Sequence, residues 1–115
     1  CGGNRDRSKR PRMGAAVAEL ADQAYVTSDN PRNEDPGAIL DDIVSGMDPQ
    51  RPRIVEPDRA AAIQLALRDA RAGDTVLVAG KGHETYQETG GRMVHFDDRE
   101  VLRAALEAEA GKDPG

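Results

Sequence analysis

The feature that most constrains the fold is a short apolar run, Thr75 to Ala79, which ends at a glycine-rich break. Its five residues include no charged side chain, and its length fits one strand rather than a helix. A run of this kind is typical of a strand that is covered on both faces, as in a parallel sheet between helices. It therefore predicts a central strand over 75–79 in an α/β domain.

Helical and strand-like segments alternate along the rest of the chain. Apolar residues recur at helical spacing in several places, and short strand-like segments lie between them. This alternation predicts an α/β fold with an open, mostly parallel sheet flanked by helices. The expected elements are a loop over 1–12, helices over 13–22 and about 39–47, strands over 24–27 and 53–56, a helix that starts near 58 and stops before 73, a hairpin of 84–88 with 92–96, and a last helix that begins after 97.

Local signals support several of these boundaries. Gly90 and Gly91 lie between two strand-like segments, as in a tight hairpin. Asp97 and Glu100 have the spacing of a capping box for the last helix. We expect the chain to fray from Gly111, so that the domain covers 1–110 and 111–115 form a tail.

Composition excludes several classes of protein. With 115 residues the chain is long enough for one domain that has a core of its own. A single cysteine excludes a disulfide scaffold, and one cysteine with two separated histidines does not make a zinc site. The apolar runs are too short to span a membrane and no leader-like segment opens the chain, which favours a soluble cytoplasmic domain. Three aromatic residues are too few to stack the bases of single-stranded nucleic acid.

Charge is unevenly distributed. Residues 5–12 carry five basic side chains and one acid, a net of +4, whereas the whole chain carries −5. A basic cluster at the start of an acidic domain favours a site for a small anion, such as phosphate or carboxylate, over a nucleic-acid surface. A solvated loop is the alternative interpretation.

Two chemically unusual loops, 28–36 and 80–84, each follow a predicted strand. In open α/β sheets the ligand binds beyond the carboxyl ends of the strands, so both loops are expected at one edge. In the first loop Arg32 offers a two-pronged donor for a carboxylate, Asp29 can accept from an ammonium, and Pro31 limits how far these groups move. Such a set suits a zwitterionic amino acid. The alternative is a plain turn before a helix that Asp35 caps.

The second loop reads Gly80, Lys81, Gly82, His83, Glu84. It is not a P-loop, because that motif would require Gly where Thr75 stands and Ser or Thr after the lysine. The glycines would let the backbone approach a ligand closely, and the carboxylate of Glu84 could pair with an amine. A plain turn with a solvated glutamate is the alternative.

Three motifs, taken together, resemble the Mur ligase family. They are CGGNRDRSKRPRMG at 1–14, DNPR at 29–32 and AGKGHE at 79–84, in the order and spacing seen in the C-terminal domain of these ligases. The resemblance extends to about residue 107 and implies a Rossmann-like α/β domain. It is greatest for members that add meso-diaminopimelate, in which DNPR resembles the recognition motif for that amino acid. Asn4 stands where family members commonly have Asp.

The resemblance also implies roles for individual residues. Arg5 and Arg32 would bind the distal carboxylate of diaminopimelate, and Glu84 would bind an ammonium at the same end. Lysine lacks that carboxylate and would leave the arginines unpaired, which disfavours it. No catalytic residue is expected in this chain. The substrate-binding set that the resemblance implies is Arg5, Asp29, Asn30, Pro31, Arg32, Gly80 and Glu84.

The implied reaction is ATP-dependent amide formation in peptidoglycan synthesis, on the substrate UDP-N-acetylmuramoyl-L-alanyl-D-glutamate. In the family, ATP and Mg²⁺ are bound mainly by a central ATPase domain, and the UDP group by an N-terminal domain. The 115 residues contain no Walker-type loop, and neither domain is recognisable in them. We therefore expect the chain to be the amino-acid-binding part of a longer ligase and to be inactive alone.

Two alternatives remain open. The chain could belong to another ligase of this type, one that adds lysine or one of the folate or cyanophycin type. It could also be a non-catalytic α/β module that binds a small anion.

Overall fold

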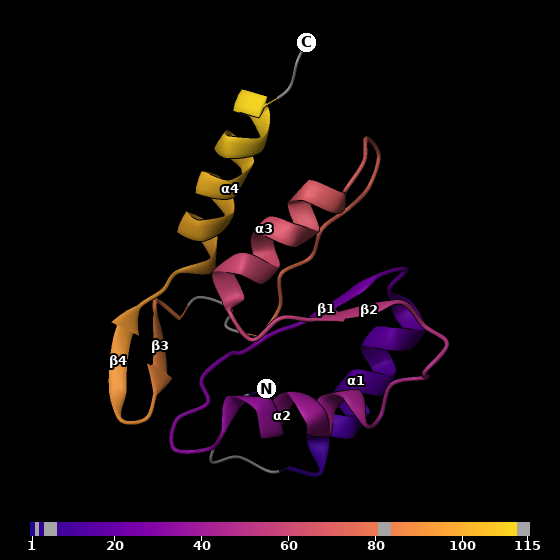
Figure 1. The fold of residues 1–115 in the computed structure, drawn as a ribbon, viewed down its shortest axis with the longest axis vertical. Coiled ribbons are helices and arrows are strands. Elements are labelled where there is room, and N and C mark those ends of the chain that lie inside the picture. Colours follow the sequence, from indigo (N-terminus) through magenta and orange to yellow (C-terminus); the bar gives the residue numbers. More distant parts are fainter. Residues whose placement is uncertain (2, 4–6, 81–83, 113–115) are drawn as a thin grey trace.

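The computed structural model describes residues 1, 3, 7–80 and 84–112, and Figure 1 shows the order of their helices and strands. None of the helices within these ranges is both long and apolar enough to cross a lipid bilayer. The elements are α1 (Lys9–Leu20), β1 (Ala24–Val26), α2 (Pro36–Val44), β2 (Arg53–Val55), α3 (Arg59–Asp69), β3 (Tyr86–Thr89), β4 (Arg92–His95) and α4 (Asp98–Lys112).

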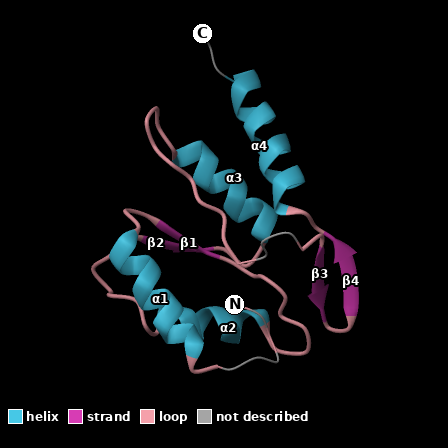
Figure 2. Ribbon diagram, turned by 180° about the vertical axis from the view of Figure 1, so that it is seen from behind, coloured by secondary structure: helices cyan, strands magenta, loops and turns pink. Residues whose placement is uncertain are grey.

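The fold is α/β, with helices on both sides of a parallel strand pair. β1 and β2 run parallel, with Ala24 opposite Arg53 and Val26 opposite Val55. α1 packs against α2 on one side of this pair, and α3 packs against α4 on the other (Figures 1 and 2). β3 and β4 form a separate antiparallel hairpin. The predicted fold class is therefore confirmed, and so are the strands that became β1 and β2.

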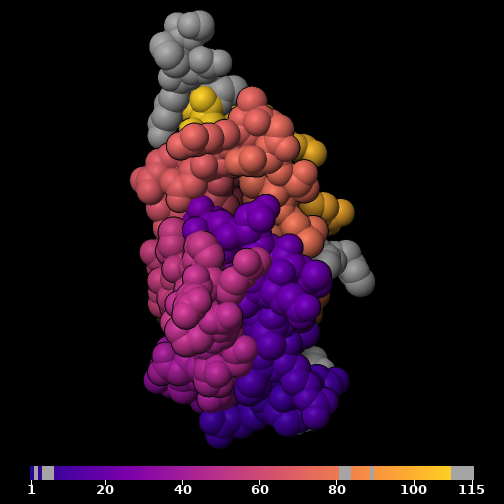
Figure 3. Space-filling view, turned by 90° about the vertical axis from the view of Figure 1, so that its right-hand side faces the viewer, coloured from indigo at the N-terminus to yellow at the C-terminus, as the bar shows by residue number. Residues whose placement is uncertain are grey.

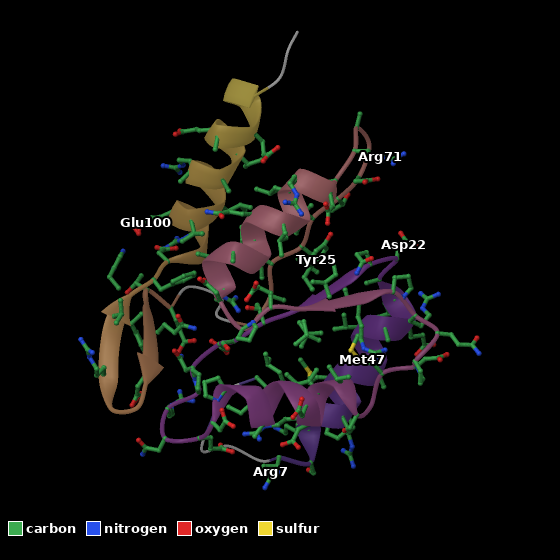
Figure 4. The ribbon with its side chains drawn as sticks, in the orientation of Figure 1. Arg7, Asp22, Tyr25, Met47, Arg71 and Glu100 are labelled. Carbon is green, nitrogen blue, oxygen red and sulfur yellow. The ribbon has the colours of Figure 1, made fainter. Side chains whose placement is uncertain are left out.

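The two faces of β1 contact different helices, as alternation along a strand requires. Tyr25 lies on the α3 side, where its hydroxyl donates a hydrogen bond to Asp69 at 2.8 Å. Figure 4 shows Tyr25 and Met47 on opposite sides of the strand pair. Burial, followed by the hydrogen bond to Asp69, raises the pKa of Tyr25 to about 12. The core on the α1–α2 side comprises Ala18, Ala24, Val26, Ile39, Leu40, Ile43 and Met47.

Two aspartates cap helices as the sequence predicts. The carboxylate of Asp35 accepts from the backbone N–H of Gly37 at 3.1 Å, which satisfies one of the free donors at the start of α2. Asp58 accepts from the N–H of Ala61 at 3.3 Å at the start of α3. The starts of both helices are thus fixed by local chemistry.

The hairpin β3–β4 is also confirmed. Its turn residues Gly90 and Gly91 have φ angles of 56° and 80°. Two consecutive positive φ values belong to the tight hairpin turn whose twist matches the flanking strands, and glycine adopts them without steric cost.

Asp97 caps the start of α4, but through other hydrogen bonds than those of the predicted capping box. Asp97 accepts from the N–H of Arg99 at 2.9 Å, and the hydrogen bonds from Arg99 hold the pKa of the Asp97 carboxyl below its ordinary value. Glu100 instead contacts the His95 ring at 2.6 Å. The helix continues to Lys112. A glycine near a helix end costs too little to stop it, so the helix passes Gly111. Residues 113–115 lie outside the described residues.

The central strand expected over 75–79 is not formed. Within the described ranges no segment pairs with these residues, and the side chain of Leu77 is 85% exposed. Val76 and Val78 are half-buried, so one side of the segment packs on the domain. Figure 3 shows this coral part of the chain at the surface, above the indigo and violet N-terminal part. An apolar run indicates that a segment is buried, but a strand also needs a hydrogen-bonded neighbour.

Helix α1 begins at Lys9, four residues before its predicted start at 13. Pro11 lies in its first turn, where a missing backbone N–H breaks no helical hydrogen bond. The prediction of a loop through residue 12 was wrong for this reason. Close packing of α1 on α2 depends on Gly14, because a Cβ there would overlap the carbonyl of Ile43.

Candidate functional site

The candidate site is built around the loop that leaves β1. Ser28, Asp29, Asn30 and Pro31 are buried, although the segment has no regular structure. Asn30 is almost fully enclosed, with 1% of its surface exposed. A loop can be buried in this way only if its polar groups find partners within the protein.

Those partners come from the N-terminal segment and from strand β3. The backbone N–H of Gly3 donates to the carbonyl of Asn30 at 2.6 Å. From the other side, the Gln87 amide donates to the carbonyl of Asp29 at 2.8 Å, and the N–H of Glu88 donates to Asn30 Oδ1 at 2.9 Å. The loop is therefore held between the N-terminal segment and strand β3.

Arg32 extends this pairing in an unusual backbone conformation. Its φ is 55°, and it is the one non-glycine residue with positive φ in the described part of the chain. Its N–H donates to the carbonyl of Glu88 at 2.9 Å, and its carbonyl accepts from Gly90 at 2.6 Å. A left-handed conformation in an arginine costs about 1 kcal/mol, so the surroundings must impose it.

The Arg32 side chain is directed back along the loop. Nη1 donates to the carbonyl of Gly3 at 3.0 Å, and Nε lies 3.7 Å from the carboxylate of Glu88. Among the described residues no acceptor contacts Nη2. One prong of the guanidinium thus has no acceptor within the part of the chain that the structure describes.

The second loop meets the first at Gly80. A Cβ placed on Gly80 would lie 3.7 Å from Asp29 Oδ2, and the φ of Gly80 is 114°. The expected convergence of the two loops is therefore seen at this point. The carboxylate of Glu84, half-buried, accepts from the Tyr86 hydroxyl at 3.3 Å.

Seven residues of the predicted motifs lie outside the described residues. They are Gly2, Asn4, Arg5, Asp6, Lys81, Gly82 and His83. Asp29, Asn30, Pro31, Arg32 and Gly80 are brought together at one end of β1, and Glu84 follows at the base of the hairpin.

The far side of the first loop is anchored by a buried arginine. Arg10, 1% exposed, donates to Glu34 at 2.9 Å and to Asp42 at 2.9 Å. The hydrogen bond to Glu34 is the main cause that raises the pKa of Arg10. The start of α1 is thereby tied to both the loop and α2.

Sequence reasoning missed several residues that support the site. Gln87 and Glu88 hold the first loop, and Arg59 donates to the carbonyls that precede Asp29 and Gly80. The available signal was weak, since a lone arginine at a helix start reads as a solvated surface residue.

The side chains offer donors and acceptors rather than a metal site. In residues 1, 3, 7–80 and 84–112 no group of three or more His, Cys, Asp or Glu side chains is placed to hold a metal ion. What the site holds is a guanidinium and carboxylates of opposite charge around an exposed glycine. This arrangement suits a ligand that carries both an acid and an amine.

Comparisons with known proteins agree with this chemistry. The family model for the Mur ligase, glutamate ligase domain, matches residues 1–82. The chain is 63% identical over 106 residues to the UDP-N-acetylmuramoyl-L-alanyl-D-glutamate–2,6-diaminopimelate ligase of Synechococcus sp. (strain WH7803), covering 92% of this chain and 21% of that protein. It is 61% identical, with the same coverage, to the ligase of that name from Thermosynechococcus vestitus.

A solved structure gives the same result for the fold. A structure of a UDP-N-acetylmuramoyl-L-alanyl-D-glutamate–2,6-diaminopimelate ligase superposes with a TM-score of 0.90 at 45% sequence identity. The match covers 96% of this chain and 23% of the solved one. The chain therefore spans about a fifth of the length of the curated relatives that it matches.

Proposed function

The chain belongs to the Mur ligase family, and from that premise we propose that it is the amino-acid-binding domain of a ligase that adds meso-diaminopimelate to UDP-N-acetylmuramoyl-L-alanyl-D-glutamate. The observation that carries the proposal is the junction of two loops, where Asp29 and Gly80 approach each other beside the Arg32 loop. The names of the curated relatives support the same substrate.

Diaminopimelate suits this junction because each of its ends carries both an ammonium and a carboxylate. One end supplies the amine that reacts, and the other must be recognised. Arg32, whose Nη2 has no acceptor among the described residues, binds the distal carboxylate, and Arg5 is the second proposed donor. Glu84 binds the distal ammonium, and Gly80 leaves room for the ligand beside Asp29.

Asn30 and Pro31 contribute by fixing the loop. Oδ1 of Asn30 is already occupied by the N–H of Glu88, and the side chain is buried. Pro31 is buried against Gly3, whose Cβ, if present, would overlap the carbonyl of Pro31. The proposed substrate-binding role of these two residues is therefore to hold Arg32 and Asp29 in place.

Recognition of the distal carboxylate explains why lysine would be rejected. Lysine has an ammonium but no carboxylate at that end, so bound lysine would bury the Arg32 fork without an acceptor. A charged group that is desolvated and left unpaired costs several kcal/mol, or a discrimination of about a hundredfold or more.

The proposed reaction is formation of an amide at the expense of ATP. A carboxylate oxygen of the UDP-linked dipeptide attacks the γ-phosphorus of ATP, and ADP leaves. The diaminopimelate amine then attacks the acyl carbon, phosphate departs with that oxygen, and the amine loses a proton. In this scheme the chain's own residues only bind and orient the amine.

We place Mg²⁺ and ATP outside the described residues of this chain. Among the described residues no group of three or more His, Cys, Asp or Glu side chains is placed to hold a metal ion, and no step is assigned to a metal here. A cytoplasmic location is part of the proposal, since the substrates proposed are a nucleotide-linked precursor and ATP.

The test uses a ligase in which this chain is joined to its uridine-binding and ATPase domains. The measurement is kcat/KM for meso-diaminopimelate and for lysine, in the wild type and in Arg32→Ala. Wild-type enzyme should prefer diaminopimelate, and Arg32→Ala should lower that preference by about tenfold to a hundredfold. Arg103→Ala, which removes an exposed arginine of α4, is the control.

The outcomes separate the alternatives. Turnover of lysine at least equal to that of diaminopimelate in the wild type would indicate another ligase of this type. Unchanged preference in Arg32→Ala would refute the role assigned to the first loop.

A further inference from the structure

A buried arginine outside the predicted motifs lies directly behind the junction of the two loops. Arg59 is the first residue of α3, and it is 4% exposed. Its Nε donates to Asp98 Oδ1 at 2.7 Å, and its Nη2 donates to Asp98 Oδ2 at 2.6 Å. Asp98, the first residue of α4, is 7% exposed, so the guanidinium and the carboxylate form a buried two-pronged pair.

The remaining donors of Arg59 contact the two loops. Nη1 donates to the carbonyl of Ser28 at 3.1 Å, and Nη2 donates to the carbonyl of Ala79 at 3.2 Å. Ser28 is the residue before Asp29, and Ala79 is the residue before Gly80. A single planar group thus fixes the last peptide before each half of the junction.

Helix packing alone does not account for an arginine at this position. A cation at a helix N-terminus is opposed by the helix dipole, and a buried ion pair is commonly no more stabilising than well-packed apolar side chains. Two apolar residues could join α3 to α4 equally well. They could not hold two backbone carbonyls at a fixed separation, which a rigid guanidinium does.

We propose that Arg59, held by Asp98, is a positioning residue that sets the spacing between Asp29 and Gly80 and hence the fit of diaminopimelate. The proposal rests on the function proposed above. The carbonyl of Ser28 belongs to the peptide group that is bonded to Asp29, and the carbonyl of Ala79 to the peptide group that is bonded to Gly80. Because a peptide group is planar and rigid, a shift of either carbonyl also shifts the residue that follows it. Arg59 itself touches neither reacting group.

The test replaces the pair in a way that spares the fold. In the ligase that carries this chain with its other domains, the double variant Arg59→Met/Asp98→Leu removes both charges and leaves apolar side chains of similar size. Replacing both partners of a buried pair can be nearly neutral for stability, whereas removing one is not. The double variant should therefore fold, but its two loops should lose their common anchor.

The expected result is a split among the kinetic constants. KM for meso-diaminopimelate should rise about tenfold or more, which corresponds to about one lost charge-assisted contact. KM for ATP and for the UDP-linked dipeptide should stay within about twofold. Arg59→Lys, which keeps the charge but not the fork, should fall between the wild type and the double variant.

Arg51 provides a matched control. It also donates to backbone carbonyls, those of Ala18 at 2.6 Å and Ala21 at 3.0 Å, but these lie at the end of α1 away from the two loops. Arg51→Met should leave KM for diaminopimelate unchanged.

Amide hydrogen exchange tests the role of Arg59 without any substrate. In the double variant the amides of Asp29, Asn30 and Arg32 should exchange faster, while those in α2 should not change. Unchanged exchange there, an unchanged KM for diaminopimelate, or failure of the double variant to fold would each overturn the proposal. If the wild type does not use diaminopimelate, the proposed function fails, and exchange at these amides still decides the role of Arg59.

Discussion

Asn30 and Glu88, 58 residues apart in the sequence, are joined by a hydrogen bond of 2.9 Å from the backbone N–H of Glu88 to Asn30 Oδ1. The carbonyl of Glu88 in turn accepts from the N–H of Arg32 at 2.9 Å. Both backbone groups of one strand residue are therefore used to hold the first loop. The hairpin supports the site because strand β3 forms hydrogen bonds with the first loop, as it would with a neighbouring strand.

Loss of the Asn30 side chain should loosen this attachment. Asn30→Ala leaves the N–H of Glu88 without its acceptor in a partly buried position, which should cost about 1–3 kcal/mol. The thermal unfolding midpoint of the 115-residue chain measures the loss. Asn33→Ala, an exposed residue of the same loop, is the control. Equal midpoints for the two variants would show that the hydrogen bond does not support the loop.

The left-handed backbone of Arg32 allows its effect on stability to be measured separately from its proposed role in substrate preference. Its φ of 55° is strained for arginine and for alanine but not for glycine. Arg32→Gly should therefore be more stable than Arg32→Ala by about 1 kcal/mol, as measured by chemical unfolding of the chain. Both variants should lose the preference for diaminopimelate to the same degree in the complete ligase. Equal stability of the two would contradict the strain.

Signals that act over a few residues were the ones that predicted the fold correctly. Asp35 and the pair Gly90 and Gly91 specify a helix start and a turn through contacts with their own neighbours. The run over 75–79 misled because its secondary structure depends on a hydrogen-bonded neighbour that no local pattern reveals. Pro11 misled for the opposite reason, since a proline is compatible with the first turn of a helix.

The residues of the candidate site also differ in whether the sequence could predict them. The motif residues Asp29, Arg32 and Gly80 could be proposed from their chemistry and from the rule that strand ends share an edge. Arg59 and Glu88 could not, because their roles exist only once segments 20 to 58 residues apart are in contact. Sequence reasoning therefore named the groups that are proposed to face a ligand and missed the residues that hold the two loops.

Two helical glycines should respond in opposite ways to the same substitution. A Cβ on Gly14 would overlap the backbone carbonyl of Ile43, so Gly14→Ala must push α1 away from α2. We expect a loss of about 2 kcal/mol. At Gly37 the nearest atom would be 3.6 Å away, an ordinary contact, so Gly37→Ala should stabilise α2 by about 0.5 kcal/mol. Chemical unfolding of the chain measures the change in the free energy of unfolding for both variants. A change of the same sign in the two would contradict the close packing of α1 on α2 at Gly14.

The ion pairs of Asp42 should make stability depend on pH in the acid range. Arg10 donates to Asp42 at 2.9 Å and Arg7 at 3.2 Å. These hydrogen bonds, that from Arg10 first, hold the pKa of the Asp42 carboxyl below its ordinary value of 3.8. Because the unfolded chain takes up the proton at the higher pH, the stabilisation is complete above the ordinary pKa and is lost as the pH falls through the folded one.

Asp42→Asn removes the titrating group and so should flatten this part of the profile. We expect the variant to be less stable than the wild type near neutral pH, with the difference narrowing as the pH falls below about 4. Thermal unfolding midpoints of the chain, taken between about pH 7 and pH 2.5, measure this. Asp41→Asn, an exposed neighbour on the same helix, should follow the wild-type curve. If the unfolding midpoints of Asp42→Asn and the wild type change in parallel with pH, the ion pair between Arg10 and Asp42 does not stabilise the fold.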